Sequence, residues 1–162
     1  MCDSKLAAKL AAKARAKIEP TEDLAKIAES FGGEVVLKDF WDTEDTTSLV
    51  IEPSGRFRAF IDSNAGPLGQ RFELAHELGH WFFYNQKHGK KKKVPASIDR
   101  YGNREDNEEA NVFAAEFLIP GEELKKKFKE LHGDLWALSE HFLVPIWMVS
   151  ARITAYGLSG KS

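Results

Sequence analysis

The chain has 162 residues and a formal net charge of −2 at pH 7, and 43% of its residues are hydrophobic. This composition predicts one folded domain with a substantial core, and the near-zero charge excludes a general polyanion-binding protein. The single cysteine, Cys2, excludes an internal disulfide and a cysteine-ligated zinc cluster, and it favours a cytoplasmic location. No run of 18 apolar residues is present, so we expect no membrane partner.

The first part of the chain predicts two helices followed by short strands. Residues 4–18 carry an apolar stripe beside a lysine stripe, which is typical of a helix with one solvated face. Thr21 is a suitable N-cap for a second helix, which we expect to end at Phe31-Gly32-Gly33. Alternating apolar residues then predict a small antiparallel sheet built from the segments 34–37, 49–51 and 57–62.

A His-Glu-x-x-His motif lies in the stretch Arg-Phe-Glu-Leu-Ala-His-Glu-Leu-Gly-His at residues 71–80, within a predicted helix of about residues 68–84. Positions i and i+4 share one face of a helix, so His76 and His80 can direct two imidazoles at one metal ion. Glu77 follows the first histidine and is near enough to take a proton from a water on that metal.

The residues around the motif favour a buried metal site over a pair of surface histidines. A helix that is apolar on most sides is buried, and buried polar groups without partners are costly. Gly79 costs roughly 1 kcal/mol relative to alanine inside a helix, which indicates that another segment approaches closely at this point. The apolar flanking residues are Leu74, Ala75, Leu78, Trp81, Phe82 and Phe83.

Beyond the motif the sequence predicts a loop and then further helices. The four lysines at 90–93 are typical of a solvated loop rather than of a nucleic-acid site. We expect a helix at 108–118 that is stopped by a proline and a glycine, and a charged helix at 121–131. The segment 135–156 predicts helix, turn and helix, with Pro145 in the first turn of the last helix.

A catalytic zinc usually has three protein ligands, so the two histidines need a third partner. The acidic start of the 108–118 helix is the richest source, and Asn111 in that helix can hold a ligand histidine in place. Glu108 lies about 60° from Asn111 around the helix, whereas Glu109 lies on the far side. This geometry favours Glu108 as the third ligand, with Glu109 or another residue as the alternative.

Three segments make the sequence similar to the ImmA/IrrE family of zinc metallopeptidases. They are QRFELAHELGH at 70–80, EANVFAAEFLIP at 109–120 and the tail that starts with FLVP at 142–145. The resemblance implies an α+β, zincin-like fold of the gluzincin type, with a small antiparallel sheet packed on the His-Glu-x-x-His helix. It also implies a metallopeptidase-like domain at 1–134, with a helix-turn-helix-like tail at 135–158 packed on it.

One position departs from the family pattern. The family usually has a glutamate ligand four residues before the asparagine, and this position is Asn107 here. An amide is a poor zinc ligand. Either Glu108 takes over through a small helix shift, or the metal binds weakly, or activity is lost.

The resemblance implies a zinc-dependent endopeptidase that cleaves helix-turn-helix repressors of phage, mobile-element or stress-response genes. We expect Zn²⁺ to be held by His76, His80 and Glu108, with Glu77 as the general base. The partner is then a protein substrate, and no direct nucleic-acid contact is expected. The sequence does not single out an oxyanion-stabilising residue among the candidates Tyr84, His88, Tyr101 and Arg152.

Two alternatives remain open. The first is a regulatory protein that binds a repressor or DNA through the helical tail without cutting; the last helix of the tail carries only Arg152 as a cation, which argues against DNA. The second is a structural zinc site. Such a site is normally closed by four protein ligands, and no fourth candidate has a convincing spacing.

Overall fold

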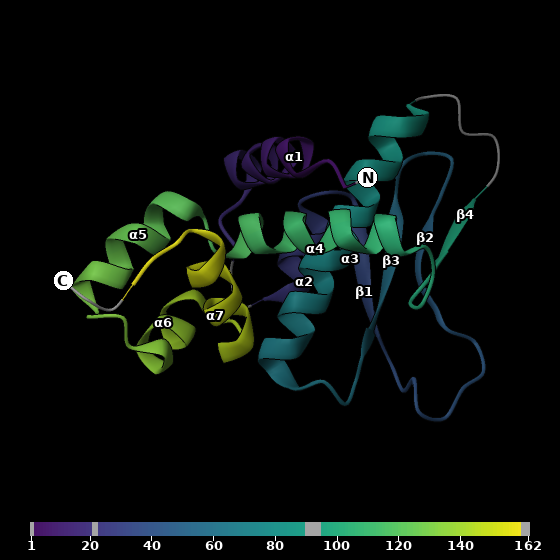
Figure 1. The fold of residues 1–162 in the computed structure, drawn as a ribbon. Coiled ribbons are helices and arrows are strands. Elements are labelled where there is room, and N and C mark those ends of the chain that lie inside the picture. The colour runs from purple at the N-terminus through teal and green to yellow at the C-terminus, as the bar shows by residue number, and fades with distance from the viewer. Residues whose placement is uncertain (1, 21–22, 90–94, 160–162) are drawn as a thin grey trace.

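The computed structural model describes residues 2–20, 23–89 and 95–159, which fold into helices around a small sheet (Figure 1). The predicted cap Thr21 and the lysine run at 90–93 lie outside the described residues. In the described part Asp23 caps the second helix, because its side chain accepts a hydrogen bond from the amide of Lys26. The elements in chain order are α1 (Ser4–Lys17), α2 (Leu24–Glu29), β1 (Gly33–Lys38), β2 (Thr47–Ile51), β3 (Phe57–Asp62), α3 (Gly66–His88), β4 (Ala96–Asp99), α4 (Arg104–Leu118), α5 (Gly121–Glu130), α6 (Leu135–Phe142) and α7 (Ile146–Ala155).

The sheet is mixed and has the strand order β1-β3-β2-β4. β2 pairs antiparallel with β3 and with β4, but β1 runs parallel to β3, so the prediction of an antiparallel sheet is wrong for this pair. A tight turn joins β2 to β3 and makes them antiparallel neighbours, whereas the whole of β2 and its loops separate β1 from β3. That length of chain allows the crossover that parallel strands need.

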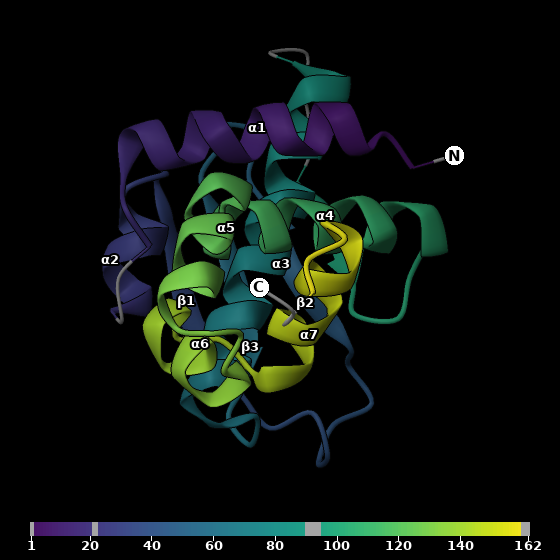
Figure 2. The ribbon, with the colours of Figure 1, turned by 60° about the vertical axis from the view of Figure 1, so that its left-hand side comes forward.

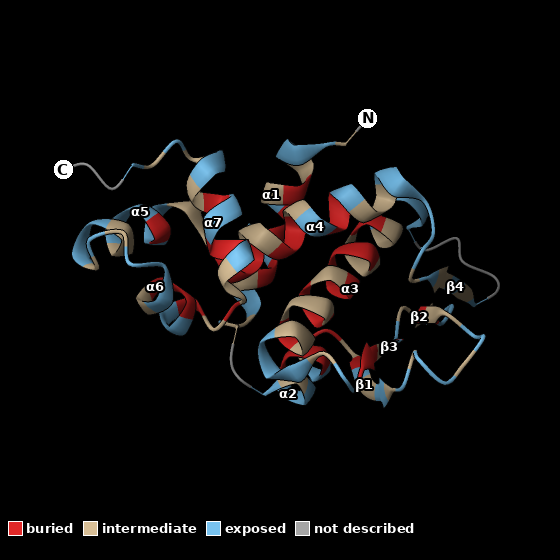
Figure 3. Cartoon of the chain, turned by 60° about the horizontal axis from the view of Figure 1, so that its bottom comes forward, coloured by how far each residue is buried: buried red, intermediate tan, exposed pale blue. Residues whose placement is uncertain are grey.

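α3 is the central helix of the molecule and packs against β3 on one side and α4 on the other, with α1 covering α4 (Figures 1 and 3). Gly79 lies where α4 crosses. A Cβ atom added to Gly79 would be 2.9 Å from Cα of Ala110 and 3.0 Å from its carbonyl oxygen. The predicted close approach at Gly79 is therefore confirmed, and it brings the start of α4 alongside the histidines of α3.

α5, α6 and α7 gather at one end of the molecule (Figures 1 and 2). Arg71 of α3 connects this end to the centre, since its buried guanidinium donates hydrogen bonds to the carbonyl oxygens of Pro20, Phe142 and Leu143 at 2.9, 2.6 and 2.9 Å. Leu143 ends α6 in the left-handed conformation, with φ of 54°. Among the described residues, no helix has both the length and the apolar character that crossing a bilayer requires.

Candidate active site

Three donor atoms from α3 and α4 meet at one point. Nε2 of His76 lies 3.1 Å from Nε2 of His80, and Oδ1 of Asn107 lies 3.2 Å from the first and 2.9 Å from the second. The two histidines are brought together by their spacing of four residues on α3. Asn107 comes from the first turns of α4, the helix that crosses α3 beside Gly79.

The ring of His76 is held in one orientation by Asn111. Oδ1 of Asn111 lies 2.8 Å from Nδ1 of His76, so the carbonyl oxygen accepts a hydrogen bond from this nitrogen. The bond keeps the proton on Nδ1 and leaves a lone pair on Nε2, the nitrogen that faces Asn107. This agrees with the expectation that Asn111 orients a histidine.

Asn107 reaches the histidines because α4 begins four residues earlier than the sequence pattern predicts. The side chain of Asn103 caps α4 by accepting from the amide of Asp106, and helix therefore already runs from Arg104. Asn107 and Asn111 are then one helical turn apart on the same face. Nδ2 of Asn107 donates to the carbonyl oxygen of Gly102 at 3.4 Å, which turns Oδ1 toward the imidazoles.

The structure does not bring the two glutamates that follow Asn107 to the histidines. Glu108 points along the outside of α4, where its carboxylate lies 3.0 Å from Nε of Arg104 and the side chain is 48% exposed. Glu109 is buried on another side of the helix, 3.8 Å from Nζ of Lys87. Asn107 therefore occupies the place beside the histidines where Glu108 was expected.

Both histidines are neutral at pH 7 in this environment. Burial lowers the pKa of His80 to about 4, with the neighbouring His76 as the second cause. Burial also lowers the pKa of His76, and its hydrogen bonds to Asn111 and Asn107 oppose this effect. A neutral imidazole is the form that binds metal ions.

Glu77 is buried beside this cluster, with 4% of its surface exposed. Burial raises the pKa of its carboxyl group to about 8, and a hydrogen bond with Ser48 of β2 partly offsets the rise. Within the described residues Oε2 of Glu77 has no hydrogen-bond partner. The carboxyl group therefore has one oxygen without a partner and keeps its proton at pH 7 in the metal-free protein. A cation bound at the histidines would lower this pKa and allow the carboxylate to act as a general base.

A cavity of about 160 Å³ opens onto the cluster and contains a cation that the sequence pattern did not single out. Arg100, directly after β4, lies with Nη1 2.5 Å from Oε1 of Glu73 and Nη2 3.8 Å from Oδ2 of Asp62. The strand β4 is short and has a single large apolar residue, which is why neither it nor Arg100 was predicted. The cavity is lined by Phe72, Glu73, His76, Glu77, Arg100 and Asn111.

None of the four residues named earlier as oxyanion candidates lines this cavity. Tyr84 stacks against His88 near the end of α3, with ring centroids 4.4 Å apart. Tyr101 is 72% exposed. Arg152 is buried in α7, where its Nη1 lies 3.2 Å from Oε1 of Glu116.

The cluster fits a divalent metal ion in its geometry, and less well in its charge. Donors about 2.0–2.1 Å from a tetrahedral zinc ion are about 3.3 Å from one another, close to the 2.9–3.2 Å separations of these three atoms. No group of three or more His, Cys, Asp or Glu side chains is arranged to hold a metal ion among the described residues, because the third donor here is an amide. Two imidazoles and an amide provide no negative charge.

Comparison with known proteins gives a family match and solved structures of similar fold. Residues 27–154 match the model of the family Peptidase_M78, described as the IrrE N-terminal-like domain. A solved structure described as a Mycobacterium tuberculosis transcriptional regulator has a similar fold, with a TM-score of 0.54 at 20% sequence identity. The similarity covers 93% of this chain and 46% of that chain, so the chain spans about half the length of this relative.

No curated protein matches the sequence. The resemblance to the ImmA/IrrE family that the motifs carried is confirmed by the family match, which includes the whole of α3 and α4. The chain therefore belongs to the family of IrrE N-terminal-like domains, Peptidase_M78.

Proposed function

We propose that the protein is a zinc-dependent endopeptidase in which Nε2 of His76, Nε2 of His80 and Oδ1 of Asn107 hold the metal. The observation that carries this proposal is the convergence of these three atoms within 3.2 Å of one another. Nε2 of His76 presents a lone pair at this point, and a cation would replace the hydrogen bonds that join the three atoms in the metal-free protein. A zinc ion would supply a polarised substrate carbonyl and a water of lowered pKa.

The protein side chains around the cluster would then take three roles. Glu77 accepts a proton from the attacking water through its free Oε2 and later returns it to the leaving amine. Asn111 keeps His76 in the tautomer that presents a lone pair on Nε2. Arg100 lies in the cavity wall, paired with Glu73, and its guanidinium N–H groups would donate to the carbonyl oxygen, where negative charge develops during attack.

The substrate is a protein, and we propose a cytoplasmic helix-turn-helix repressor. Support comes from membership of a peptidase family and from the likeness of the sequence to ImmA/IrrE proteins. Direct contact with DNA through α7 has little support, since Arg152 is its single cation and is 7% exposed and paired with Glu116.

The test combines metal content with cleavage. The purified wild-type protein is compared with its Glu77→Gln variant for bound zinc and for digestion of the helix-turn-helix regulator encoded beside it. Both proteins should bind zinc to the same extent, and only the wild type should cut the regulator. Cleavage by Glu77→Gln at the wild-type rate would disprove the role of Glu77, and failure of the zinc-loaded wild type to cut would disprove the endopeptidase.

A second function is favoured by one observation, the neutral amide of Asn107 in the donor set. A member that binds metal weakly would act as a regulator that holds the repressor without cutting it. The two functions differ in the complex they leave behind. Stable co-elution of the uncut regulator with zinc-loaded wild-type protein supports the second function, and fragments of the regulator support the first.

A further inference from the structure

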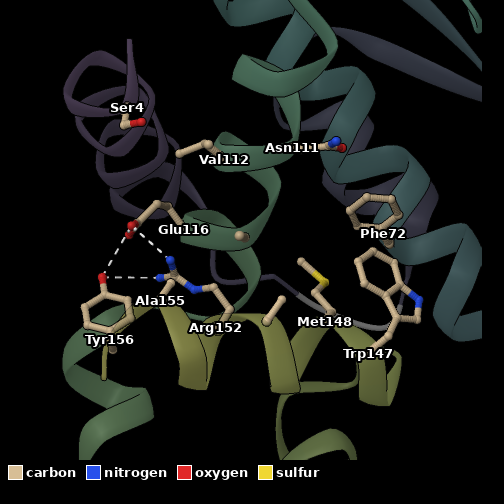
Figure 4. Close-up of a pocket in the computed structure, with 12 residues that line it drawn as sticks. Ser4, Phe72, Asn111, Val112, Glu116, Trp147, Met148, Arg152, Ala155 and Tyr156 are labelled. Carbon is tan, nitrogen blue, oxygen red and sulfur yellow. Dashed lines mark hydrogen bonds and ion pairs between the residues drawn. The ribbon is translucent and has the colours of Figure 1, made fainter. Parts of the chain in front are cut away.

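A groove of about 480 Å³ lies between α4 and α7, on the side of the candidate active site that faces away from the sheet (Figure 4). Its floor carries small side chains, Ala115 of α4 and Ala151 and Ala155 of α7, and these leave the space open. We call it the α4–α7 groove. Its remaining lining residues are Ser4, Phe72, Asn111, Val112, Glu116, Trp147, Met148, Arg152 and Tyr156.

The α4–α7 groove adjoins the histidine cavity. Phe72 and Asn111 line both spaces, and Asn111 is the residue that holds His76. The ring of Phe72 lies 6.1 Å from the ring of His76 on one side and 5.1 Å from Trp147 on the other. Figure 4 shows Trp147 and Phe72 together at this end of the groove. A substrate polypeptide whose peptide group lies at the histidines would therefore have its neighbouring residue beside the groove.

The sizes of the two spaces assign them different parts of a substrate. The histidine cavity, at about 160 Å³, is small and would accommodate the reacting peptide group and its attacking water rather than a large side chain as well. Adjacent residues of an extended chain are about 3.3–3.6 Å apart, so a large side chain next to the reacting bond must enter a neighbouring space. The α4–α7 groove, at about 480 Å³, is three times as large and is next to the cavity at Phe72 and Asn111.

The chemistry of the groove selects an apolar occupant. Its two opposite charges, Arg152 and Glu116, lie 3.2 Å apart, and Tyr156 donates to the same carboxylate at 3.3 Å (Figure 4). Arg152 also donates to the carbonyl oxygen of Ile119 at 2.8 Å, so its charge is already engaged. Trp147 is 58% exposed and leaves part of an apolar ring on the wall of the groove.

We propose that the α4–α7 groove accommodates a large apolar side chain of the polypeptide substrate, such as Leu, Met or Phe, adjacent to the cleaved bond. The proposal rests on the proposed function, which supplies the reacting peptide group at the histidines. It means that residues of α7 determine substrate preference. The sequence pattern predicts this helix as part of a helix-turn-helix-like tail. The tail then forms one wall of the substrate site.

The test uses binding to the zinc-loaded Glu77→Gln protein, which separates recognition from cleavage. The probes are two fluorescein-labelled dodecapeptides of Gly, Ser and Lys that differ only in a central Leu or Asn, whose side chains have the same number and branching of heavy atoms. The Leu peptide should bind about ten- to a hundred-fold more tightly by anisotropy, as expected for the burial of one leucine side chain. Equal binding of the two peptides, or no binding of either, would overturn the proposal.

Matched variants locate the binding. Ala151→Phe fills the groove and should remove the preference for Leu, whereas Ser150→Phe puts the same ring on an exposed neighbour that does not line the groove and should keep it. Trp147→Ala removes an exposed wall residue and should also lower the preference, in case Ala151→Phe does not fold. Equal effects of the two Phe variants would contradict the assignment.

Wild-type protein with zinc distinguishes this proposal from the proposed function. A Leu preference in binding without cleavage of either peptide or of the regulator would reject the endopeptidase and keep the groove. Cleavage of both peptides at equal kcat/KM would reject the groove and keep the endopeptidase.

Discussion

Oδ1 of Asn107 lies 2.9 Å from Nε2 of His80, closer than the two histidine nitrogens lie to each other. The amide therefore occupies the third corner of the cluster, and its own Nδ2 is anchored to the carbonyl oxygen of Gly102. An amide oxygen carries a partial charge where a carboxylate carries a full one. The proposed metal site would therefore have a neutral donor set, and the first prediction measures the effect of the missing charge.

Changing Asn107 to Asp should increase zinc affinity by at least about tenfold, because the two side chains have nearly the same shape and a carboxylate adds a full negative charge. A competition titration against a chelator measures the effect. Glu108→Gln is the matched control and should leave the affinity unchanged, since Glu108 faces Arg104 on the outside of α4. If Glu108→Gln weakened zinc binding and Asn107→Asp did not strengthen it, the third ligand would be Glu108.

Gly79→Ala should destabilise the protein by about 1–3 kcal/mol, because the new Cβ would be 2.9 Å from Cα of Ala110 and α4 would have to move. Urea unfolding measures the loss, and zinc affinity should fall with it, since Asn107 moves with α4. Gly69→Ala, in the first turns of the same helix, is the control. Its Cβ would meet only the methyl group of Ala65 at 3.2 Å, so the expected change is below about 1 kcal/mol. A stabilised Gly79→Ala protein would show that α4 is not held at this distance.

The metal-free protein should lose stability as the pH rises from about 6.5 to about 8. Burial raises the pKa of Glu77 from 4.5 to about 8, so in this window the unfolded chain has released a proton that the folded protein keeps, and unfolding becomes more favourable by up to about 1.4 kcal/mol per pH unit. Below pH 6.5 the free energy of unfolding also depends on His80, whose pKa is lowered to about 4 by burial. This histidine makes the folded protein more stable as the pH rises, opposite to the effect of Glu77. The two effects oppose each other there, and the loss appears above pH 6.5.

Urea unfolding in the presence of a chelator at pH 6.5 and pH 8 measures this loss, which we expect to be about 2 kcal/mol in total. Glu77→Gln should remove it. Glu122→Gln, at a 94% exposed side chain, should not. A wild-type protein of equal stability at both pH values would show that Glu77 ionises freely in the folded state.

Arg100→Gln should lower kcat for a cleaved peptide by about ten- to a hundred-fold and change KM by less than about threefold, because a charge in the cavity wall acts on the transition state. Arg100→Lys should recover part of kcat, since lysine keeps the positive charge but lacks the planar guanidinium that pairs with Glu73. Arg104→Gln, at a 93% exposed side chain, is the control and should retain wild-type kcat. A rise in KM at constant kcat would assign Arg100 to substrate binding alone.

The spacing of His76 and His80 was enough to place their rings together, because the geometry of one helix fixes positions four residues apart. The glycine between them predicted the close crossing of a second helix for an equally local reason, since only a residue without a side chain fits there. Both inferences needed no knowledge of distant parts of the chain. They concern a helix whose apolar character made its burial evident.

The third donor was harder to predict because it depends on where α4 begins. Glu108 and Asn107 differ by about 100° around the helix, and the choice between them depends on how α4 crosses α3. The N-cap at Asn103 and the helix crossing at Gly79 together determine which residue of α4 faces the histidines. Asn103 is a polar residue in a stretch with no apolar pattern, so its capping role could not be recognised from the sequence. The parallel pairing of β1 with β3 is likewise a long-range property that strand patterns do not encode.

The guanidinium of Arg71 donates hydrogen bonds to carbonyl oxygens from two distant parts of the chain, before α2 and at the end of α6, while its own helix carries both imidazoles. A protein that ends before α6 would leave the buried guanidinium of Arg71 without two of its hydrogen-bond acceptors. It would also lack α7, which forms one wall of the groove. α6 and α7 are thus tied to the helix that carries the imidazoles, and a shortened version for biochemistry that keeps both this link and the α4–α7 groove has to extend through residue 155.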